Sequence, residues 1–140
     1  MSQEFTLHEK LAADCALVTD WPLSRVLLMN DAAYPWLILV PRLPGLRDLD
    51  DLTPPSLQEI AREIQSLSKV MKEIFKPTKM NVAALGNMVP QLHIHVIARF
   101  EDDPAWPGPV WGVQPPEPYE REALEARVSS LRRALDSVVA

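Results

Sequence analysis

The sequence contains no long hydrophobic run, and this absence limits the classes of protein to which it can belong. No apolar stretch approaches the roughly 20 residues that a membrane-spanning helix requires. The first ten residues, MSQEFTLHEK, are polar and acidic and contain no basic stretch leading into an apolar one, so we expect no secretory signal there. These absences predict a soluble, cytoplasmic protein that does not associate with membranes.

Cysteine and positive charge are also scarce. Cys15 is the only cysteine, so no intramolecular disulfide can form, and its apolar neighbours predict a thiol packed in a strand. The formal net charge of −5 argues against a general nucleic-acid-binding protein, which normally presents a basic face. It does not exclude a small anionic ligand, because backbone N–H groups and a few histidines can bind phosphate locally.

What is present is the composition of an ordinary folded domain. The chain has 140 residues, of which 47% are hydrophobic and 24% charged, and it shows neither an internal repeat nor a low-complexity block. A core of this size needs no metal or disulfide for stability. We expect residues 1–140 to form one domain in which residues 119–140 are a C-terminal helical extension.

Hydrophobic periodicity predicts strands joined by short turns, with helices between groups of strands. The expected strands are 15–18, 25–29, 36–40, 79–85 and 92–99, and the expected helices are 5–14, 54–75 and 119–138. The proline-rich segment 101–118 cannot be regular. Because the strands form hairpins rather than repeated βαβ units, we expect an α+β fold with an antiparallel sheet of about five strands.

The helix over 54–75 has the clearest signals. Apolar residues recur along it at three- and four-residue spacing and make one stripe. Its start can be capped in two ways: Thr53 with Pro54 in the first turn, or Ser56 with Glu59 as a capping box. Pro77 ends it.

The segment Gln91–Ile97 concentrates the polar groups of one predicted strand. Alternate side chains of a strand face opposite sides, so His93 and His95 share one face with Gln91. The apolar residues of the other face belong against the helices: Leu92, Ile94, Val96 and Ala98.

Three interpretations of this histidine pair remain open. The two side chains can be hydrogen-bonded and have no catalytic or binding role. They can supply two zinc ligands, but a third ligand is needed, the remaining histidine is His8, and no further metal motif accompanies the pair. They can also act on phosphorus, since a neutral imidazole is a nucleophile at neutral pH while its neighbour donates a hydrogen bond to a phosphate oxygen.

The segment resembles the signature of the histidine triad (HIT) family, in which three histidines alternate with apolar residues. Here Gln91 stands at the first histidine position, and His93 and His95 at the other two. The resemblance extends over roughly residues 13–112, through the Gly86–Asn87 turn, Asn30 at the end of its strand, the step from a strand to Pro41, and the long helix.

The resemblance implies a HIT-like fold, a homodimer and a nucleotide ligand. We expect neither a cofactor nor a metal. The resemblance also implies hydrolysis or nucleotidyl transfer at the α-phosphate of nucleoside phosphoramidates, dinucleoside polyphosphates or nucleotide sugars. His93 would be the nucleophile that forms a nucleotidyl-histidine intermediate. The implied substrate-binding residues are His95 and Asn87 for phosphate, Asn81 for phosphate or leaving group, Asn30 for ribose, and Gln91 beside the nucleophile.

Two departures from the family pattern define a second hypothesis. The first motif histidine orients the nucleophile through its backbone carbonyl, which Gln91 retains. A further family histidine, which helps to move protons, is matched by Trp36, so no group here obviously protonates the leaving group. The alternative is therefore a nucleotide-binding or sensing protein with little turnover.

Three other aromatic or titratable residues carry weaker expectations. We expect His8 at the surface. Trp106 and Trp111 either reach the site or a partner subunit, or cover the edge of the sheet.

Overall fold

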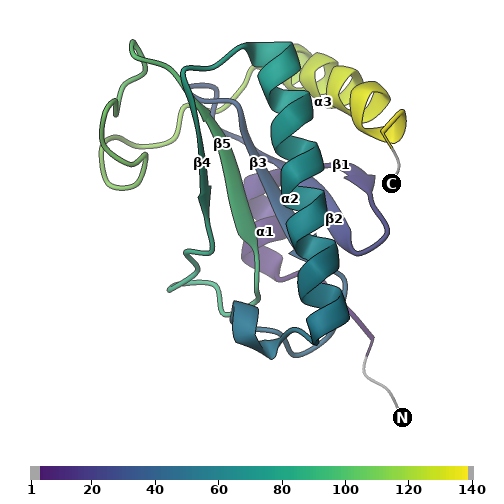
Figure 1. Cartoon of the computed structure of the whole chain (residues 1–140). Helices are drawn as coiled ribbons and strands as arrows, with labels where there is room; N and C mark the ends of the chain where they lie inside the picture. The colour runs from purple at the N-terminus through teal and green to yellow at the C-terminus, as the bar shows by residue number, and fades with distance from the viewer. Residues whose placement is uncertain (1–3, 139–140) are drawn as a thin grey trace.

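The sequence folds into an antiparallel sheet with helices on both faces (Figure 1). The computed structural model describes residues 4–138. Its elements follow in this order: α1 (Glu9–Asp14), β1 (Cys15–Asp20), β2 (Ser24–Met29), β3 (Trp36–Pro41), the 3-10 helix η1 (Leu49–Asp51), α2 (Pro54–Phe75), β4 (Lys79–Ala83), β5 (Ile94–Arg99) and α3 (Arg121–Asp136).

The five strands are arranged in the order β1-β2-β3-β5-β4, and every neighbouring pair is antiparallel. Consecutive strands form the predicted hairpins, while β5 inserts between β3 and β4. This insertion places the start of β3 beside the end of β5, with Trp36 opposite Ile97 and Ile38 opposite His95. The α+β fold with about five antiparallel strands is confirmed.

One face of the sheet is covered by α2 and α3. Its buried cluster joins Ile60, Leu67 and Met71 of α2 with Leu131 and Leu135 of α3. The strand residues of this cluster include all four that alternation assigns to the helix side: Leu92, Ile94, Val96 and Ala98. The predicted alternation over 92–98 is therefore confirmed.

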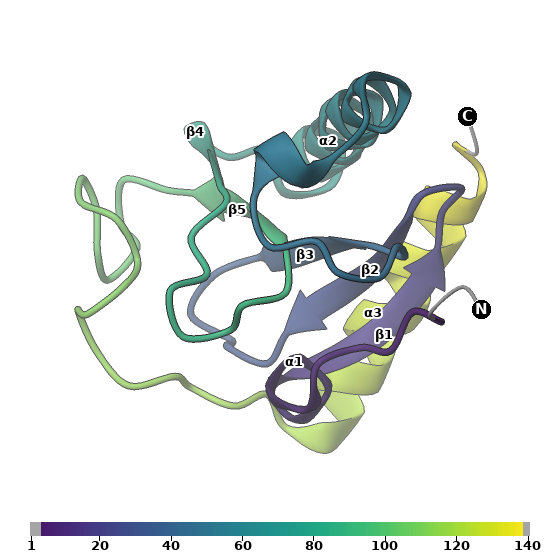
Figure 2. The ribbon, with the colours of Figure 1, turned by 90° about the horizontal axis from the view of Figure 1, so that it is seen from below.

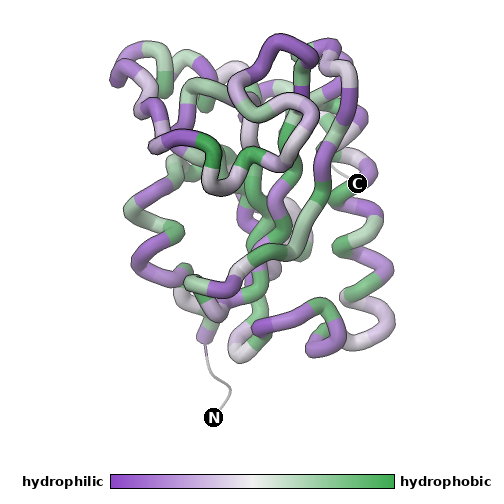
Figure 3. The backbone as a smooth tube through the Cα atoms, turned by 90° about the vertical axis from the view of Figure 1, so that its left-hand side faces the viewer, coloured by the Kyte–Doolittle hydropathy of each residue, from purple (hydrophilic) through white to green (hydrophobic). Residues whose placement is uncertain are grey.

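The opposite face is covered by α1 and by extended segments. Figure 2 shows α1 and the segment 101–118 on the side of the sheet away from α2. The buried cluster here includes Leu11, Leu27, Trp36, Ile38 and Ile97. Figure 3 shows hydrophobic residues gathered along the central strands, whereas hydrophobic and hydrophilic residues alternate along the helices. His95, which lies opposite Ile38 of this cluster, belongs to the same face.

The long helix begins and ends where its sequence signals predict. Thr53 is the N-cap, and its side chain accepts a hydrogen bond from the backbone N–H of Ser56, so the first of the two capping alternatives is the one used. Lys76 adopts a left-handed conformation after the last turn, with φ of 52°, and Pro77 follows. The buried residues of α2 include Glu63, a carboxylate that the apolar stripe does not predict.

Several predicted bounds are wrong, each for a local reason. The predicted helix 5–14 is helical only from Glu9, because His8 caps it by accepting a hydrogen bond from the N–H of Lys10. The strand predicted from Leu92 begins at Ile94, because the N–H of Leu92 bonds to Leu46 outside the sheet. The strand predicted over 79–85 ends at 83, and the last helix is shorter at both ends than 119–138. The segment 101–118 is irregular, as predicted.

Within residues 4–138, none of the helices combines the length and the hydrophobicity that crossing a bilayer would require.

Candidate active site

The two histidines lie side by side where β5 begins. His93 immediately precedes the strand and His95 is its second residue. Both are almost fully buried, with 5% and 4% of their surface exposed. Their ring centroids are 4.9 Å apart at an interplanar angle of 73°. The structure therefore brings together the pair that alternation places on one face.

The ring of His93 is oriented by the backbone just before β5. Its Nδ1 lies 2.7 Å from the backbone carbonyl oxygen of Gln91. A carbonyl can only accept, so Nδ1 carries the proton and Nε2 has a free lone pair. Burial lowers the pKa of His93 from 6.5, the bond to Gln91 raises it, the nearby His8 lowers it, and the net shift is downward. His93 is therefore neutral at neutral pH, with Nε2 as its basic atom.

The ring of His95 is held at both nitrogens. The indole N–H of Trp36 donates to Nδ1 at 3.1 Å, and Nε2 lies 3.0 Å from the carbonyl oxygen of Leu85. An indole only donates and a carbonyl only accepts, so the proton of His95 is on Nε2. Burial lowers the pKa of His95 to about 4; the bond to Leu85 raises it and His93 lowers it further. His95 is an uncharged hydrogen-bond donor.

A cavity of about 260 Å³ opens in front of the two rings. Its walls are His93, His95, Trp111 and the turn from Leu85 to Val89. Trp111 contacts the edge of His95, with 5.1 Å between ring centroids, so the irregular segment 101–118 reaches the site. Of the two alternatives for Trp111, the structure therefore shows the one in which it lines the site.

A smaller, polar cavity of about 60 Å³ lies on another side of His93. Its wall includes the oppositely charged Arg47 and Asp48 together with Asn87 and Gln91. Gly86, Asn87 and His93 line both cavities, so Asn87 is at the boundary between them. The predicted residues Gln91, Asn87, His93 and His95 are thus gathered at one place, where two cavities of different size meet.

The side chain of Gln91 ties the N-terminal segment to the site. Its Oε1 accepts a hydrogen bond from the N–H of His8 at 2.8 Å, and its Nε2 donates to the carbonyl of Thr6 at 2.8 Å. The sequence predicts a surface position for His8; in the structure His8 is half-buried and close enough to lower the pKa of His93. Nothing in the local sequence signals this contact, because it joins positions 83 residues apart.

The other two predicted asparagines lie outside these cavities. Asn30 lines a separate cavity of about 350 Å³ together with Lys10, Asp31 and Trp36, and its Oδ1 accepts a hydrogen bond from the N–H of Tyr119. Trp36 belongs to the wall of this cavity and also bonds to His95, so its indole lies between the two regions.

Asn81 instead belongs to a buried network around Arg99. Its Oδ1 accepts a hydrogen bond from Arg99 at 2.8 Å. Arg99 also forms an ion pair with Asp103 at 2.8 Å and donates to the carbonyl of Gly108. The guanidinium lies 5.9 Å from the ring centroid of Trp106. This network orders the start of the segment that carries Trp111, and Trp106 packs on it away from the histidines.

Gly86, which the sequence predicts only as part of a polar turn, lies directly against His93. A Cβ atom at this position would lie 2.8 Å from Cε1 of His93 and 3.0 Å from the carbonyl oxygen of Val89. These distances are shorter than van der Waals contact, so only glycine lets the turn approach the ring this closely. A glycine beside the histidine motif is the signal that could have identified it.

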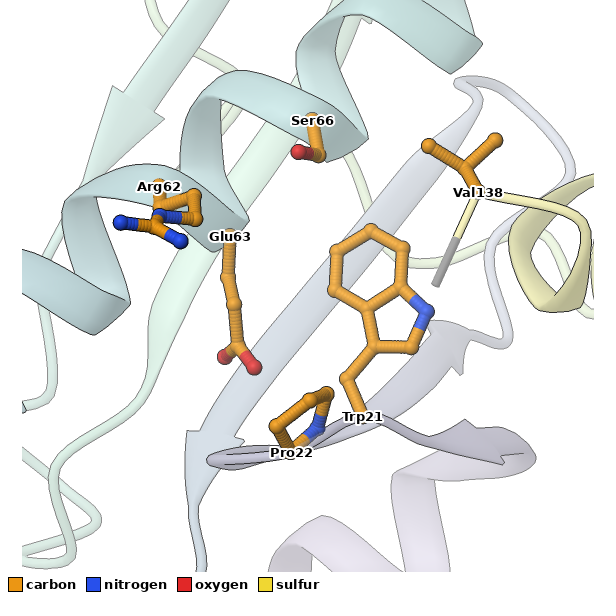
Figure 4. A pocket seen from close by; sticks show the side chains of 6 residues that line it. All are labelled: Trp21, Pro22, Arg62, Glu63, Ser66 and Val138. Atoms are coloured by element: carbon orange, nitrogen blue, oxygen red, sulfur yellow. The ribbon is translucent and has the colours of Figure 1, made fainter. Parts of the chain in front are cut away.

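A further small cavity lies on the other face of the sheet, between α2 and the β1–β2 turn (Figure 4). Trp21, Glu63 and Val138 are in its wall, and its volume of about 10 Å³ is no more than one water needs. The buried Glu63 accepts hydrogen bonds from the N–H groups of Leu23 and Ser24. This carboxylate therefore connects α2 to the turn and is remote from the histidines.

The geometry bears directly on the zinc interpretation. In residues 4–138, the only group of three potential metal-binding side chains is the exposed set Asp48, Asp50 and Asp51, which excludes both histidines of the pair. Nδ1 of His93 and both nitrogens of His95 are already hydrogen-bonded. The pair as arranged offers a ligand atom only at Nε2 of His93, short of what zinc requires.

Comparisons with known proteins show which family shares this fold. A histidine triad protein of Marinobacter aquaeolei is 50% identical, with 99% of this chain and 100% of that chain covered and a TM-score of 0.94. One of Bradyrhizobium japonicum is 45% identical over 94% and 98% of the two chains, with a TM-score of 0.91.

A bis(5'-adenosyl)-triphosphatase of Saccharomyces cerevisiae is 32% identical over 69 residues, which are 46% of this chain and 34% of that protein. The chain thus aligns with about a third of the length of this curated relative. The family model described as HIT domain matches residues 10–102. With most of the described chain covered by that match, the protein belongs to the HIT domain family.

Proposed function

We propose that this protein is a nucleotide hydrolase or nucleotidyl transferase that acts at an α-phosphate through His93. The observation that carries the proposal is the orientation of that ring: the 2.7 Å bond from Nδ1 to the carbonyl of Gln91 leaves Nε2 unprotonated beside a cavity. A buried, neutral imidazole with one fixed nitrogen is a nucleophile in the protonation state that attack requires.

The reaction has two balanced steps. Nε2 of His93 attacks the α-phosphorus, a phosphorus–nitrogen bond forms, and the bond to the leaving group breaks with its electron pair on that group. Water or a second acceptor then attacks the nucleotidyl-histidine and releases the ring. With water, the products are a nucleoside monophosphate and the protonated leaving group. Catalysis depends mainly on positioning and on neutralising charge at the phosphate.

The neighbouring groups suit this role to different degrees. His95 and Asn87 border the same cavity as His93, and we assign them to the phosphate oxygens. Asn30 borders the cavity of about 350 Å³ on the other side of Trp36, where we place the ribose. Gln91 contributes its carbonyl to the nucleophile and its side chain to the N-terminal segment. For Asn81 the bond to Arg99 supports a structural role more than contact with phosphate.

Substrates with acidic leaving groups fit the site best. Trp36 carries no titratable group, so nothing at that position can pass a proton to the leaving group. Phosphate leaving groups, as in dinucleoside polyphosphates and nucleotide sugars, depart without prior protonation more readily than amines do. We therefore place dinucleoside polyphosphates ahead of phosphoramidates, and the partial similarity to a bis(5'-adenosyl)-triphosphatase supports that order.

The decisive experiment compares the wild type with His93→Ala on diadenosine triphosphate and on an adenosine phosphoramidate. The variant should lose turnover by roughly a thousandfold or more, and a rapidly quenched wild-type reaction should contain protein heavier by one nucleotidyl group. Nucleotide binding measured by calorimetry should persist in the variant, because Asn30 and Asn87 are unchanged. Wild-type turnover in His93→Ala would refute the proposal.

The same experiment tests a second candidate function. Where the family pattern has a further histidine, this chain has Trp36, whose indole bonds to His95 and cannot transfer a proton. This difference favours a nucleotide-binding or sensing protein with little turnover. Tight binding of a nucleotide, with neither turnover nor a covalent adduct in the wild type, would establish this candidate in place of hydrolysis.

We also propose that the protein forms a homodimer through the edge strand β4. This strand has one neighbour, β5, so the N–H and C=O groups of its other edge are open to pairing. Val82, Leu85 and Met88 expose 47%, 42% and 85% of their surface along and after it. Light scattering should give the mass of two chains, and Val82→Lys should shift it toward one. A wild-type mass of one chain would contradict the proposal.

A further inference from the structure

Trp36 has a hydrogen bond that restricts the chemistry of its neighbour. Its indole N–H donates to Nδ1 of His95 at 3.1 Å, and this bond is buried. The indole can only donate, so Nδ1 must remain without a proton as long as the bond exists. A doubly protonated His95 would place two N–H groups against each other.

The indole cannot easily turn away from this position. Trp36 is the first residue of β3 and exposes 6% of its surface. Its ring meets Tyr34 and Trp111 edge-on, with centroid distances of 6.2 Å and 5.8 Å. Rotating the indole would therefore disrupt two aromatic contacts as well as the hydrogen bond.

The other nitrogen of His95 points at the wall of the cavity. Nε2–H donates to the carbonyl of Leu85, at the edge of the turn that also contains Gly86 and Asn87. This turn lines the cavity of about 260 Å³ beside His93. A phosphate oxygen entering the cavity can accept the same proton in place of the Leu85 carbonyl, and a charge-assisted bond of this kind is the stronger one.

We propose that Trp36 is a positioning residue that keeps His95 as a permanent, uncharged Nε2–H donor aimed at the phosphate. This inference rests on the proposed function, since it assigns a task within the same site. His95 then gives the phosphate a hydrogen bond at every working pH and never delivers its proton. Trp36 acts in this through His95 and does not touch the reacting atoms.

The direct test is the protonation state of His95, read by long-range ¹H–¹⁵N NMR on protein labelled at histidine. There are three histidines, so spectra of His8→Ala and His93→Ala assign the third by elimination. Wild-type His95 should show the neutral Nε2–H pattern throughout about pH 5–8, consistent with its pKa of about 4. An Nδ1–H pattern, or a change to the charged form within that range, would overturn the proposal.

The variant Trp36→Phe removes the indole N–H and retains an aromatic ring. His95 should then titrate at higher pH, because Nδ1 can take a proton once the indole N–H is gone, and the pH profile of kcat should change on the acid side as His95 becomes charged. In the neutral ring the Leu85 carbonyl still favours the proton on Nε2. Trp21→Phe is the matched control: it also removes a buried indole hydrogen bond, to the carbonyl of Leu135, but on the opposite face. It should leave the His95 spectrum unchanged.

The outcomes separate this proposal from the proposed function. An unchanged His95 spectrum or an unchanged pH profile of kcat in Trp36→Phe would overturn the role of Trp36. If Trp36→Phe does not fold, the wild-type spectrum still decides whether His95 is the fixed Nε2–H donor. An absence of turnover in the wild type, with the expected spectra, would refute hydrolysis and leave the fixed tautomer established.

Discussion

Replacing Gly86 by alanine should disable the nucleophile without unfolding the protein. The added Cβ would lie 2.8 Å from Cε1 and 3.3 Å from Nδ1 of His93, and 3.0 Å from the carbonyl oxygen of Val89. Gly86 is not among the glycines with positive φ, so alanine can adopt its backbone conformation. The effect of the substitution is therefore a steric one on the ring.

The size of the effect follows from these distances. Carbon atoms pack at about 3.5–4.0 Å, so the ring or the turn must move by about 0.7 Å or more. The ring can move away only by straining the 2.7 Å bond from Nδ1 to Gln91. Misplacement of about 1 Å can cost a reaction about 100-fold. We expect kcat to fall by about 10- to 100-fold, or about 1.4–2.7 kcal/mol in the barrier.

The assay is steady-state hydrolysis of a dinucleoside polyphosphate, with kcat and KM measured separately. Gly108→Ala provides the matched control, because a Cβ there would lie 3.4 Å from its nearest neighbour, the carbonyl of Ala105. It should keep wild-type kcat. Both variants should retain the thermal midpoint of the wild type within a few degrees, about the range of a 1 kcal/mol change.

A folded Gly86→Ala protein with wild-type kcat would refute the reasoning. That result would mean that the ring of His93 is not confined by the turn, or that its Nε2 is not the attacking atom. Equal losses in Gly86→Ala and Gly108→Ala would show that added methyl groups act through the fold and not through His93.

Three further predictions follow from the titratable groups. The rate kcat/KM should fall on the acid side with a midpoint below pH 6.5, because burial lowers the pKa of His93 and only the unprotonated ring attacks; a pH series measures it. Asp103→Asn should lower the free energy of unfolding, measured in urea, by about 3–5 kcal/mol, because it leaves the buried Arg99 without its charged partner. Glu125→Gln, in the exposed pair with Arg121, should lower it by less than about 1 kcal/mol. Glu63→Ala should destabilise by about 2–4 kcal/mol, because two backbone N–H groups lose their acceptor, and Glu63→Gln, which keeps one oxygen, should cost less.

Each of these has a contradicting result. An acid midpoint above pH 6.5 would mean that His93 is not buried as a neutral ring. Equal losses of stability in Asp103→Asn and Glu125→Gln would mean that burial of the Arg99–Asp103 pair does not increase its contribution. If Glu63→Gln were as destabilising as Glu63→Ala, the charge of Glu63 and not its hydrogen-bond acceptor would be what matters.

The Asp103 pair also gives stability a pH dependence of known sign. Burial raises the pKa of Asp103, but hydrogen bonds from Arg99 and from the N–H groups of Phe100 and Trp106 outweigh it and leave the pKa lowered. A lowered folded-state pKa contributes stability above the ordinary value near 3.8. This contribution is lost as the pH falls through the lowered value, so it is constant across the neutral range.

Much of the candidate site could be predicted from local patterns alone. Alternation at period two places Leu92 and Ile94 on one face and His93 and His95 on the other, because the strand itself fixes that geometry. The long helix and its Thr53 cap follow equally from local spacing. The face shared by the two histidines and the position of the long helix were therefore predictable before any tertiary contact was known.

The contacts that set the protonation states required the folded structure. Trp36 and His95 are 59 residues apart, and they meet because β5 lies between β3 and β4. Gln91 and Thr6 are 85 residues apart, and their bond exists only because the N-terminal segment crosses the same face. Such pairs leave no periodic trace in the sequence.

The sequence by itself determined the local groups: two histidines on one face of a strand, an asparagine turn close to them in the chain and a long amphipathic helix, all set by spacing within a few residues. The tertiary structure decided what those residues can do. It buried His93 with Nε2 free, bonded His95 to an indole that forbids a second proton, and moved Asn81 into the network of Arg99. The physical reason is that spacing is a property of the local chain, whereas burial and hydrogen-bond partners depend on which distant segments fold against one another.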